Sequence, residues 1–389
     1  MAIMKQVYLD HCATTPIDPR VVDAMIPYFS AEYGNASSIH SYGRKARLAL
    51  EESRERIARF VGAKSDELFF TSGGTESDNH ALYGIARASK SNRKSTIVTT
   101  AIEHHAILDP LESLQTEGFN ARIVKVDRSG MVDPDDIKRE LNDDVLLVSV
   151  VHANNEVGTI EPLREIEAMC RERGVVCHTD AVQSVGKISV NVQELGIDLL
   201  SISAHKIYGP KGIGAIFIRK GTKIDSFMKG GAQESNRRAG TENVPLAVGF
   251  AKAVELCSEL MEGDATRIGK LKESLRKRIA TQFDDVLFNG HPTQSLPHVL
   301  NVSFDASKRK VDGEALIMGM DLHGVAVTSG SACTSGSLQP SHVLLAMGRD
   351  ESTARATIRF SLGRGTTEED INYTADVLKE VVDRAGKLK

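Results

Sequence analysis

The chain has 389 residues, 41% of them hydrophobic and 26% charged, which is typical of a globular protein and excludes a disordered or low-complexity architecture. Its formal net charge of −4 gives no reason to expect nucleic acid or an anionic membrane as a partner. No stretch approaches the roughly 20 apolar residues of a membrane-spanning helix, and the segment from Met1 to Asp10 lacks the pattern of a secretory signal.

The cysteines are odd in number and widely spaced, and no two have the CxxC spacing of a zinc or redox site. They are Cys12, Cys170, Cys177, Cys257 and Cys333. We therefore expect neither a disulfide framework nor an intrinsic metal site, and a reducing compartment, the cytoplasm, is predicted.

Short apolar runs alternate with amphipathic segments along the first part of the chain. Strands are predicted, in chain order, at residues 67–71, 96–100, 121–126, 145–151, 175–179, 199–203 and 214–219, with helices at 42–61, 76–89 and 163–173 between them. Several strands are apolar without a break, as in a sheet covered on both faces. The pattern predicts an α/β fold with a doubly wound, mainly parallel sheet.

The pattern changes after about residue 244. A long helix predicted at 248–283 is followed by strands at 299–304 and 357–361 and by helices at 313–322 and 368–384. We predict a large α/β domain over residues 13–260 and a smaller α+β domain formed by residues 1–12 and 261–389.

The first candidate ligand site lies where the strand at 67–71 passes into a helix. Gly73, Gly74 and Thr75 occupy this turn, so backbone N–H groups and the Thr75 hydroxyl could bind a phosphate. The alternative is an ordinary tight turn with a helix cap. The chain has neither a Walker A motif nor a complete GxGxxG motif, which disfavours a nucleotide.

Two further candidates follow strands. Asp180 lies where ligands gather in open α/β sheets, with Gln183 close behind; its carboxylate could keep a ring nitrogen protonated or could cap the next helix. Lys206 precedes a turn rich in Gly and Pro and suits a Schiff base, although a surface lysine is the commoner case. Ser203 and His205 add polar groups beside it.

Cys333 lies among small residues, in the window 328–337. Such a window offers no large apolar anchor and is expected to be mobile. A buried structural cysteine fits it poorly, so we interpret Cys333 as a reactive nucleophile.

Two fragments add polar groups. His104 and His105 are adjacent, which does not suit a shared metal, and one of them could stack on a ring or transfer protons. Arg359, amid apolar residues, suits either a carboxylate clamp or a buried structural ion pair.

Together these candidates require a phosphate, a ring nitrogen and an aldehyde, which is pyridoxal phosphate. The chain resembles the cysteine desulfurases, a class V aminotransferase-type family of fold type I, in the NifS/IscS-like branch that serves nitrogenase and general iron–sulfur cluster assembly. The resemblance covers nearly the whole chain. It is most specific in Ser-Ala-His-Lys, ending at Lys206, and in Ser-Gly-Ser-Ala-Cys-Thr-Ser, around Cys333.

The resemblance implies a role for each candidate. Lys206 matches the lysine that binds the cofactor and moves the α-proton, and Asp180 matches the partner of the pyridine nitrogen. Gln183 matches the group bonded to the ring hydroxyl, and His104 matches the imidazole that stacks on the ring and shuttles protons. The phosphate cup matches Gly74, Thr75, Ser203 and His205, with Thr241 supplied by a second subunit, which implies a homodimer. Asn155, also a cofactor contact, and Arg359 match the groups that hold the substrate carboxylate.

The implied reaction removes sulfur from L-cysteine and gives L-alanine and a persulfide on Cys333. An iron–sulfur scaffold or another sulfur-acceptor protein would take up this sulfur, and Cys333 could ligate a cluster transiently during transfer. Two departures from the family pattern are expected to leave the chemistry intact. Ala36 stands where the family usually has Pro, and the chain ends soon after Arg384, without the extension that some members use to dock a scaffold.

Three alternatives stay open. One is a related pyridoxal phosphate enzyme, namely an alanine- or serine-type aminotransferase, which has no use for Cys333, or a selenocysteine lyase. Another is a non-catalytic relay or scaffold that has the same fold but binds no cofactor. The presence of Lys206 disfavours this alternative. The last is a Cys–His hydrolase, which leaves Lys206 and Asp180 unexplained.

Overall fold

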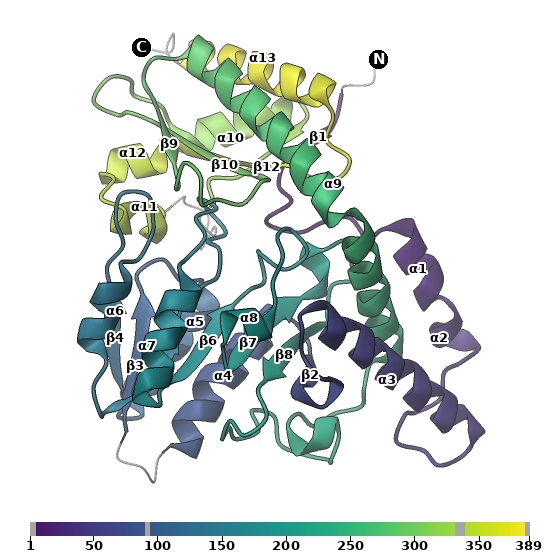
Figure 1. Cartoon of the computed structure of the whole chain (residues 1–389). Helices are drawn as coiled ribbons and strands as arrows, with labels where there is room; N and C mark the ends of the chain where they lie inside the picture. Colours follow the sequence, from purple (N-terminus) through teal and green to yellow (C-terminus); the bar gives the residue numbers. More distant parts are fainter. Residues whose placement is uncertain (1–4, 90–93, 331–338, 386–389) are drawn as a thin grey trace.

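The computed structural model describes residues 5–89, 94–330 and 339–385, and in it a large sheet and a small sheet lie at the two ends of one long helix (Figure 1). The large sheet has the strand order β2-β8-β7-β6-β5-β3-β4. Its strands are β2 (Leu68–Thr71), β3 (Thr96–Thr100), β4 (Asn120–Val124), β5 (Val145–Ser149), β6 (Val176–Asp180), β7 (Leu199–Ser203) and β8 (Gly214–Ile218).

The pairing of these strands confirms the predicted fold class. From β4 to β7 every neighbouring pair is parallel, whereas β8 is antiparallel to both β7 and β2. Parallel strands need crossover connections, which the helices between them supply. The carboxyl ends of β5, β6 and β7 therefore meet at one edge of the sheet.

Helices cover both faces of this sheet and also form the upper part of the molecule. They are α1 (Pro19–Met25), α2 (Pro27–Ser30), α3 (Ser41–Phe60), α4 (Gly74–Ala88), α5 (His105–Thr116), α6 (Pro134–Glu140), α7 (Leu163–Arg173), α8 (Val192–Leu195), α9 (Val244–Gln282), α10 (Gly313–Leu322), α11 (His342–Ala346), α12 (Glu351–Arg355) and α13 (Glu368–Ala385).

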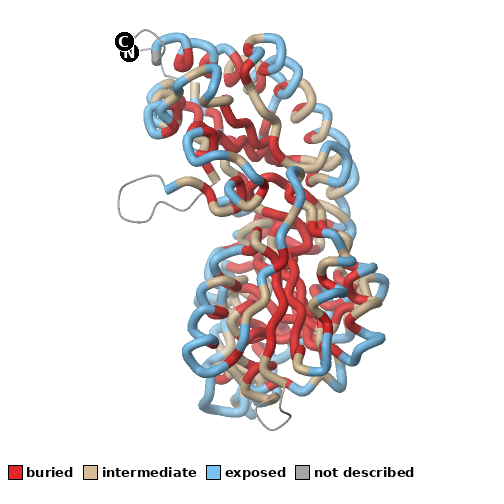
Figure 2. Tube along the Cα trace, turned by 90° about the vertical axis from the view of Figure 1, so that its left-hand side faces the viewer, coloured by how far each residue is buried: buried red, intermediate tan, exposed pale blue. Residues whose placement is uncertain are grey.

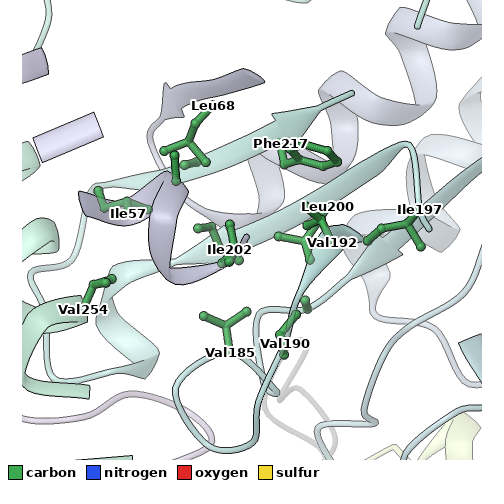
Figure 3. Packing of buried hydrophobic residues seen from close by; sticks show 14 of the residues in the cluster. Ile57, Leu68, Val185, Val190, Val192, Ile197, Leu200, Ile202, Phe217 and Val254 are labelled. Carbon is green, nitrogen blue, oxygen red and sulfur yellow. The ribbon is translucent and has the colours of Figure 1, made fainter. Parts of the chain in front are cut away.

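Alternate residues of β2, β7 and β8 pack into different cores, as the two-residue period of a strand requires. Leu199 and Ile216 face α4 and α5, whereas Leu200 and Phe217 face the opposite layer with Val254 of α9. Figure 3 shows part of that second core. In Figure 2 the buried residues follow the strands and form a separate group in the upper part of the molecule.

The small sheet is antiparallel and has the order β12-β10-β9, built from β9 (Val286–Asn289), β10 (Val299–Phe304) and β12 (Thr357–Ser361). Beside it, β1 (Val7–Tyr8) pairs in parallel with β11 (Val325–Ala326). Val7 and Leu9 share a hydrophobic cluster with Leu271 and Leu275 of α9, and α9 runs unbroken from this cluster to the large core. The domain boundaries at residues 12 and 260 stay a prediction.

Several element boundaries differ from the predicted ones. The helix predicted at 76–89 begins two residues earlier, so Gly74 and Thr75 form its first turn. Helix α5 was not predicted, because Pro110 inside it interrupts the helical pattern. Of the helices in the described residues, none combines the length and the apolar character that a membrane crossing requires.

Candidate active site

A cavity of about 400 Å³ lies at the carboxyl ends of β5, β6 and β7, and residues of the small-sheet region close its other side. Its wall consists of Asp10, Cys12, Ala13, Gly74, Thr75, Asp78, His104, Val151, Ala153, Asn155, Asp180, Val182, Gln183, Ser203, His205, Lys206, Thr328, Gly330 and Arg359. The structure thus brings together ten of the twelve residues singled out from the sequence.

The first turn of α4 forms one wall of the cavity. Gly73 caps the helix with φ 156°, and the amides of Gly74 and Thr75 belong to the helix start, where N–H groups have no acceptor within the helix. A Cβ atom added at Gly74 would lie 2.7 Å from Cγ2 of Val182, so a side chain does not fit there. Ser203 and His205 line the same cavity. Burial lowers the pKa of His205 to about 4, so this imidazole is neutral at pH 7.

Asp180 is the last residue of β6 and is 7% exposed. Its Oδ1 accepts the N–H of Val182 at 2.8 Å, so the capping role considered from the sequence is real, yet the side chain also lines the cavity. Burial raises the pKa of this carboxyl, and His104 opposes the shift. A cation brought into the cavity would favour its ionised form.

Lys206 ends a short 3-10 helix (Ala204–Lys206) directly after β7. Its Nζ donates to the backbone oxygens of Cys12 at 2.5 Å and Ala13 at 2.9 Å, and no carboxylate pairs with it among the described residues. Gln183 Nε2 donates to the same Cys12 oxygen at 2.9 Å. Burial lowers the pKa of Lys206, which increases the neutral, nucleophilic fraction of the amine.

His104 caps α5, with Nδ1 accepting the N–H of Ala106 at 3.0 Å. The ring is open to solvent through the cavity, but desolvation by the surrounding atoms lowers its pKa, and Asp180 opposes this shift. His105 has a different environment: it contacts Asp109 and lies edge-on to the ring of His342. The two histidines therefore do not act as one unit.

Arg359 reaches the cavity from β12 and is 4% exposed. One terminal nitrogen donates to the Asp10 carboxylate at 2.8 Å and the other to the backbone oxygen of Asn155 at 2.8 Å. The structural ion pair considered from the sequence is thus present. The third nitrogen, Nε, is buried and has no hydrogen-bond partner among the described residues.

Among the predicted site residues in the described part of the chain, only Thr241 does not line the cavity of its own chain. Thr241 is exposed, three residues before α9. Cys333 lies outside the described residues. Gly330, which does line the cavity, precedes Cys333 by three residues in the sequence.

Sequence reasoning missed Asp10, Cys12 and Asp78 as cavity residues. Asp78 lies four residues after Gly74, on the same face of α4, so helical spacing was a usable signal. Asp10 and Cys12 gave no such signal, because they reach the cavity through backbone contacts with Ser361, about 350 residues away in the chain.

Comparison with known proteins shows the family. The model of the aminotransferase class-V family matches residues 7–374. A cysteine desulfurase IscS of Dictyoglomus turgidum is 50% identical over 380 residues, which are 98% of this chain and 95% of that protein. Among solved structures, a NifS-like protein aligns with a TM-score of 0.91 at 37% identity, covering 98% of this chain and 100% of the other. A structure titled "SspA in complex with cysteine" aligns with a TM-score of 0.80 at 32% identity, covering 92% and 99%.

The chain therefore belongs to the aminotransferase class-V family, in its NifS/IscS-like cysteine desulfurase branch. The resemblance recognised in the sequence is confirmed, as are the fold type and pyridoxal phosphate as cofactor.

The residues of the cavity fit this cofactor. The helix start at Gly74 offers backbone donors for a phosphate, and a side chain at that position would collide with Val182. Asp180 is a buried carboxylate bonded only to a backbone N–H among the described residues, and Lys206 is an amine bonded only to carbonyl oxygens. A ring nitrogen and an aldehyde would give each of them its missing partner.

Proposed function

We propose that this protein removes the sulfur of L-cysteine, gives L-alanine, and takes up the sulfur as a persulfide on Cys333. The observation that carries the proposal is the arrangement of Lys206, Asp180 and the first turn of α4 around one cavity, in a chain 50% identical to a cysteine desulfurase over nearly its whole length.

Each part of the cofactor has a proposed partner. The phosphate would bind Gly74, Thr75, Ser203 and His205, which line the same cavity. Asp180 would hold the proton of the pyridine nitrogen, and Gln183 would bond the ring hydroxyl. His104 would stack on the ring. When bound, the cofactor supplies an electron sink for the carbon that carries the amine.

The remaining residues would bind the substrate and move its protons. Arg359 and Asn155, which both line the cavity, would hold the carboxylate of L-cysteine. Lys206, whose pKa is lowered by burial, would take the proton from the α-carbon and return a proton during formation of alanine. His104 would serve as a second proton carrier, because its lowered pKa keeps it neutral near pH 7.

The sulfur step transfers one atom. The Cys333 thiolate attacks the substrate sulfur, an S–S bond forms, and the bond between that sulfur and the β-carbon breaks with its electron pair left on carbon. That carbon then takes up a proton. One thiol and one cysteine thus give one persulfide and one alanine, without an external oxidant.

Single-turnover mass spectrometry tests this proposal. After one equivalent of L-cysteine, we expect one added sulfur on the peptide that carries Cys333, removable by reductant, and one alanine per active site. Cys333→Ser should bind cofactor normally and form neither product, because a serine hydroxyl is protonated at neutral pH. Cys170→Ala, which changes a buried thiol in α7, is the matched control and should retain both products. Added sulfur on Cys12, or full activity of Cys333→Ser, would refute the role of Cys333.

We also propose that the protein is a homodimer in which Thr241 of each subunit completes the partner's phosphate site. Thr241 is exposed and lies outside its own cavity. Helices α1, α2 and α3 lie near one another at the right of Figure 1. Exposed apolar side chains on these helices and on the loop before α3 indicate a surface that is covered in the assembly. They include Val22, Ile26, Phe29, Tyr33, Ile39, Tyr42 and Leu48.

Phe29→Glu tests the dimer, because Phe29 is 63% exposed and contributes little to the core of one subunit. Light scattering should give a dimer for the parent and a monomer for this variant, with weaker cofactor binding in the monomer. An exposed control, Ile123→Glu on β4, should remain dimeric. A monomeric parent with normal cofactor affinity would contradict the proposal.

The persulfide sulfur would pass to an iron–sulfur scaffold or another sulfur-acceptor protein in the cytoplasm. A reducing compartment is supported by Cys12, Cys170, Cys177 and Cys257, which are all buried free thiols. Transfer of radiolabelled sulfur from the loaded enzyme to a purified scaffold would test this step.

A further inference from the structure

The helix start proposed to bind the cofactor phosphate also carries a carboxylate. Glu76 is the third residue of α4 and follows directly after Thr75, which lines the cavity. Its Oε2 accepts the backbone N–H of Ser72 at 2.8 Å, so the side chain reaches back over the turn. A negative charge is favourable at a helix N-terminus in general, but here it would repel a phosphate bound to the same turn.

Arg238 neutralises this carboxylate. Its Nε donates to Oε1 of Glu76 at 2.9 Å and one terminal nitrogen donates to Oε2 at 3.3 Å. Only 20% of the Arg238 side chain and 9% of the Glu76 side chain are exposed, so solvent screens the pair weakly. Burial alone would raise the pKa of Glu76, but the bonds from Arg238 and Ser72 outweigh it and the pKa is lowered. Glu76 is therefore ionised at neutral pH and depends on Arg238 for compensation.

The segment that carries Arg238 is fixed to the same part of the sheet at a second point. The Glu234 carboxylate accepts hydrogen bonds from both terminal nitrogens of Arg54. It also accepts the backbone N–H of Phe70 in β2, at 2.8 Å. Glu234 and the two residues after it have φ angles of 44°, 53° and 63°, in the left-handed region that residues other than glycine rarely adopt. A backbone held in this way places Arg238 against α4 without relying on the Glu76 contact alone.

We propose that Arg238 is a positioning residue for the cofactor phosphate: by pairing with Glu76, it lets the first turn of α4 bind a phosphate while Glu76 keeps its bond to Ser72. This inference rests on the cofactor site proposed above and adds to it a residue that does not line the cavity. The pair of Arg238 and Glu76 therefore affects the binding of ligands that carry a phosphate and not of those that lack one. Without Arg238, the unpaired carboxylate would oppose the phosphate but not the rest of the cofactor.

Titration of the apoenzyme with pyridoxal phosphate and with pyridoxal, which lacks the phosphate, tests the proposal. Arg238→Gln should weaken binding of pyridoxal phosphate by roughly one to two orders of magnitude, the range for loss of one partner of a charge-assisted pair, and leave pyridoxal binding unchanged. Glu76→Gln combined with Arg238→Gln should restore the affinity for pyridoxal phosphate, because the uncompensated charge is gone. Arg238→Lys should restore part of it, because the charge remains but the two-point contact does not.

Arg237→Gln is the matched control. It removes a cation from the neighbouring position, but Arg237 donates to the backbone oxygen of Ile224 and not to Glu76. The ratio of the two affinities should therefore match that of the parent. If Arg238→Gln does not fold, Glu76→Gln alone decides, and the proposal expects an affinity for pyridoxal phosphate at least equal to the parent's.

Three results would overturn the role of Arg238. They are an unchanged preference for pyridoxal phosphate in Arg238→Gln, an equal loss of both ligands, and a failure of the double variant to recover. Failure of the proposed cofactor site would look different, because the parent itself would then show no preference for the phosphate-bearing ligand.

Discussion

The guanidinium of Arg359 holds two segments of the chain together and also lines the cavity. It pairs with Asp10 and with the backbone of Asn155, and its Nε has no partner in the part of the chain that the structure describes. Arg359→Gln should raise the KM for L-cysteine by roughly one to two orders of magnitude, since a charge-assisted bond contributes about 1.5–3 kcal/mol. Steady-state kinetics gives the KM, and titration of the apoenzyme should show cofactor affinity within a few-fold of the parent.

Asp10→Asn separates the two roles of Arg359, because it removes the ion-pair partner and leaves the guanidinium in place. Its KM for L-cysteine should not rise. If Arg359 mattered only as the partner of Asp10, both variants would lose stability alike and neither would change the KM selectively.

Individual site residues could be predicted where a strand end or a helix start fixes their position. Asp180, Lys206 and Gly74 are such cases, and all three line the cavity. Asp10 could not be found in this way, because its place depends on a contact between the ends of the chain. The bond of Arg238 to Glu76 joins residues 162 positions apart and left no local pattern either.

At the scale of elements, two of the three glycines of α9 have opposite surroundings. A Cβ added at Gly249 would lie 2.5 Å from Sδ of Met25, whereas one added at Gly263 meets nothing within 4 Å. Gly263→Ala should therefore raise the free energy of unfolding by about 0.5–1 kcal/mol, because glycine is costly inside a helix. Gly249→Ala should lower it. Urea unfolding measures the free energy of unfolding of both variants. Equal changes in the two variants would contradict the packing described for α9.

The larger elements could be predicted because their hydrophobic pattern is long and regular. The helix at Leu163–Arg173 and the strand at Leu199–Ser203 have the bounds expected from the sequence. The antiparallel direction of β2 and β8 could not be predicted, because a buried strand has the same apolar pattern in either direction. Short strands such as β1 and β11 are stabilised by pairing with each other, and each is too short to show a hydrophobic pattern in the sequence.

At the scale of the whole molecule, buried acids make stability depend on pH. Glu161 is 3% exposed, Oε1 has no partner among the described residues, and burial raises its pKa to about 8. The unfolded chain releases this proton near pH 4.5, whereas the folded chain holds it up to about pH 8. The free energy of unfolding therefore falls with rising pH in this window, by up to about 1.4 kcal/mol per pH unit for such a group.

Glu161→Gln carries no such proton and should escape this loss. Its stability relative to the parent should grow between pH 6.5 and 8, and this comparison cancels the titration of buried histidines such as His152, whose pKa burial lowers to about 4 and which both proteins share. Glu165→Gln, at an exposed position of α7, should show no such growth. Urea unfolding at fixed protein concentration measures both, and a pH-independent gap for Glu161→Gln would contradict the buried state of this carboxyl.

We propose that Lys206 anchors the cofactor in the cavity between the two sheets, and borohydride reduction followed by peptide mapping tests this role most directly. We expect a single reduced adduct, on Lys206, and none in Lys206→Ala, which should still fold because Lys206 bonds only to two backbone oxygens among the described residues. Lys187, whose pKa burial also lowers and whose Nζ lies 4.8 Å from the ring centre of Tyr208, is the internal control. An adduct on Lys187, or on any lysine other than Lys206, would contradict this role of Lys206.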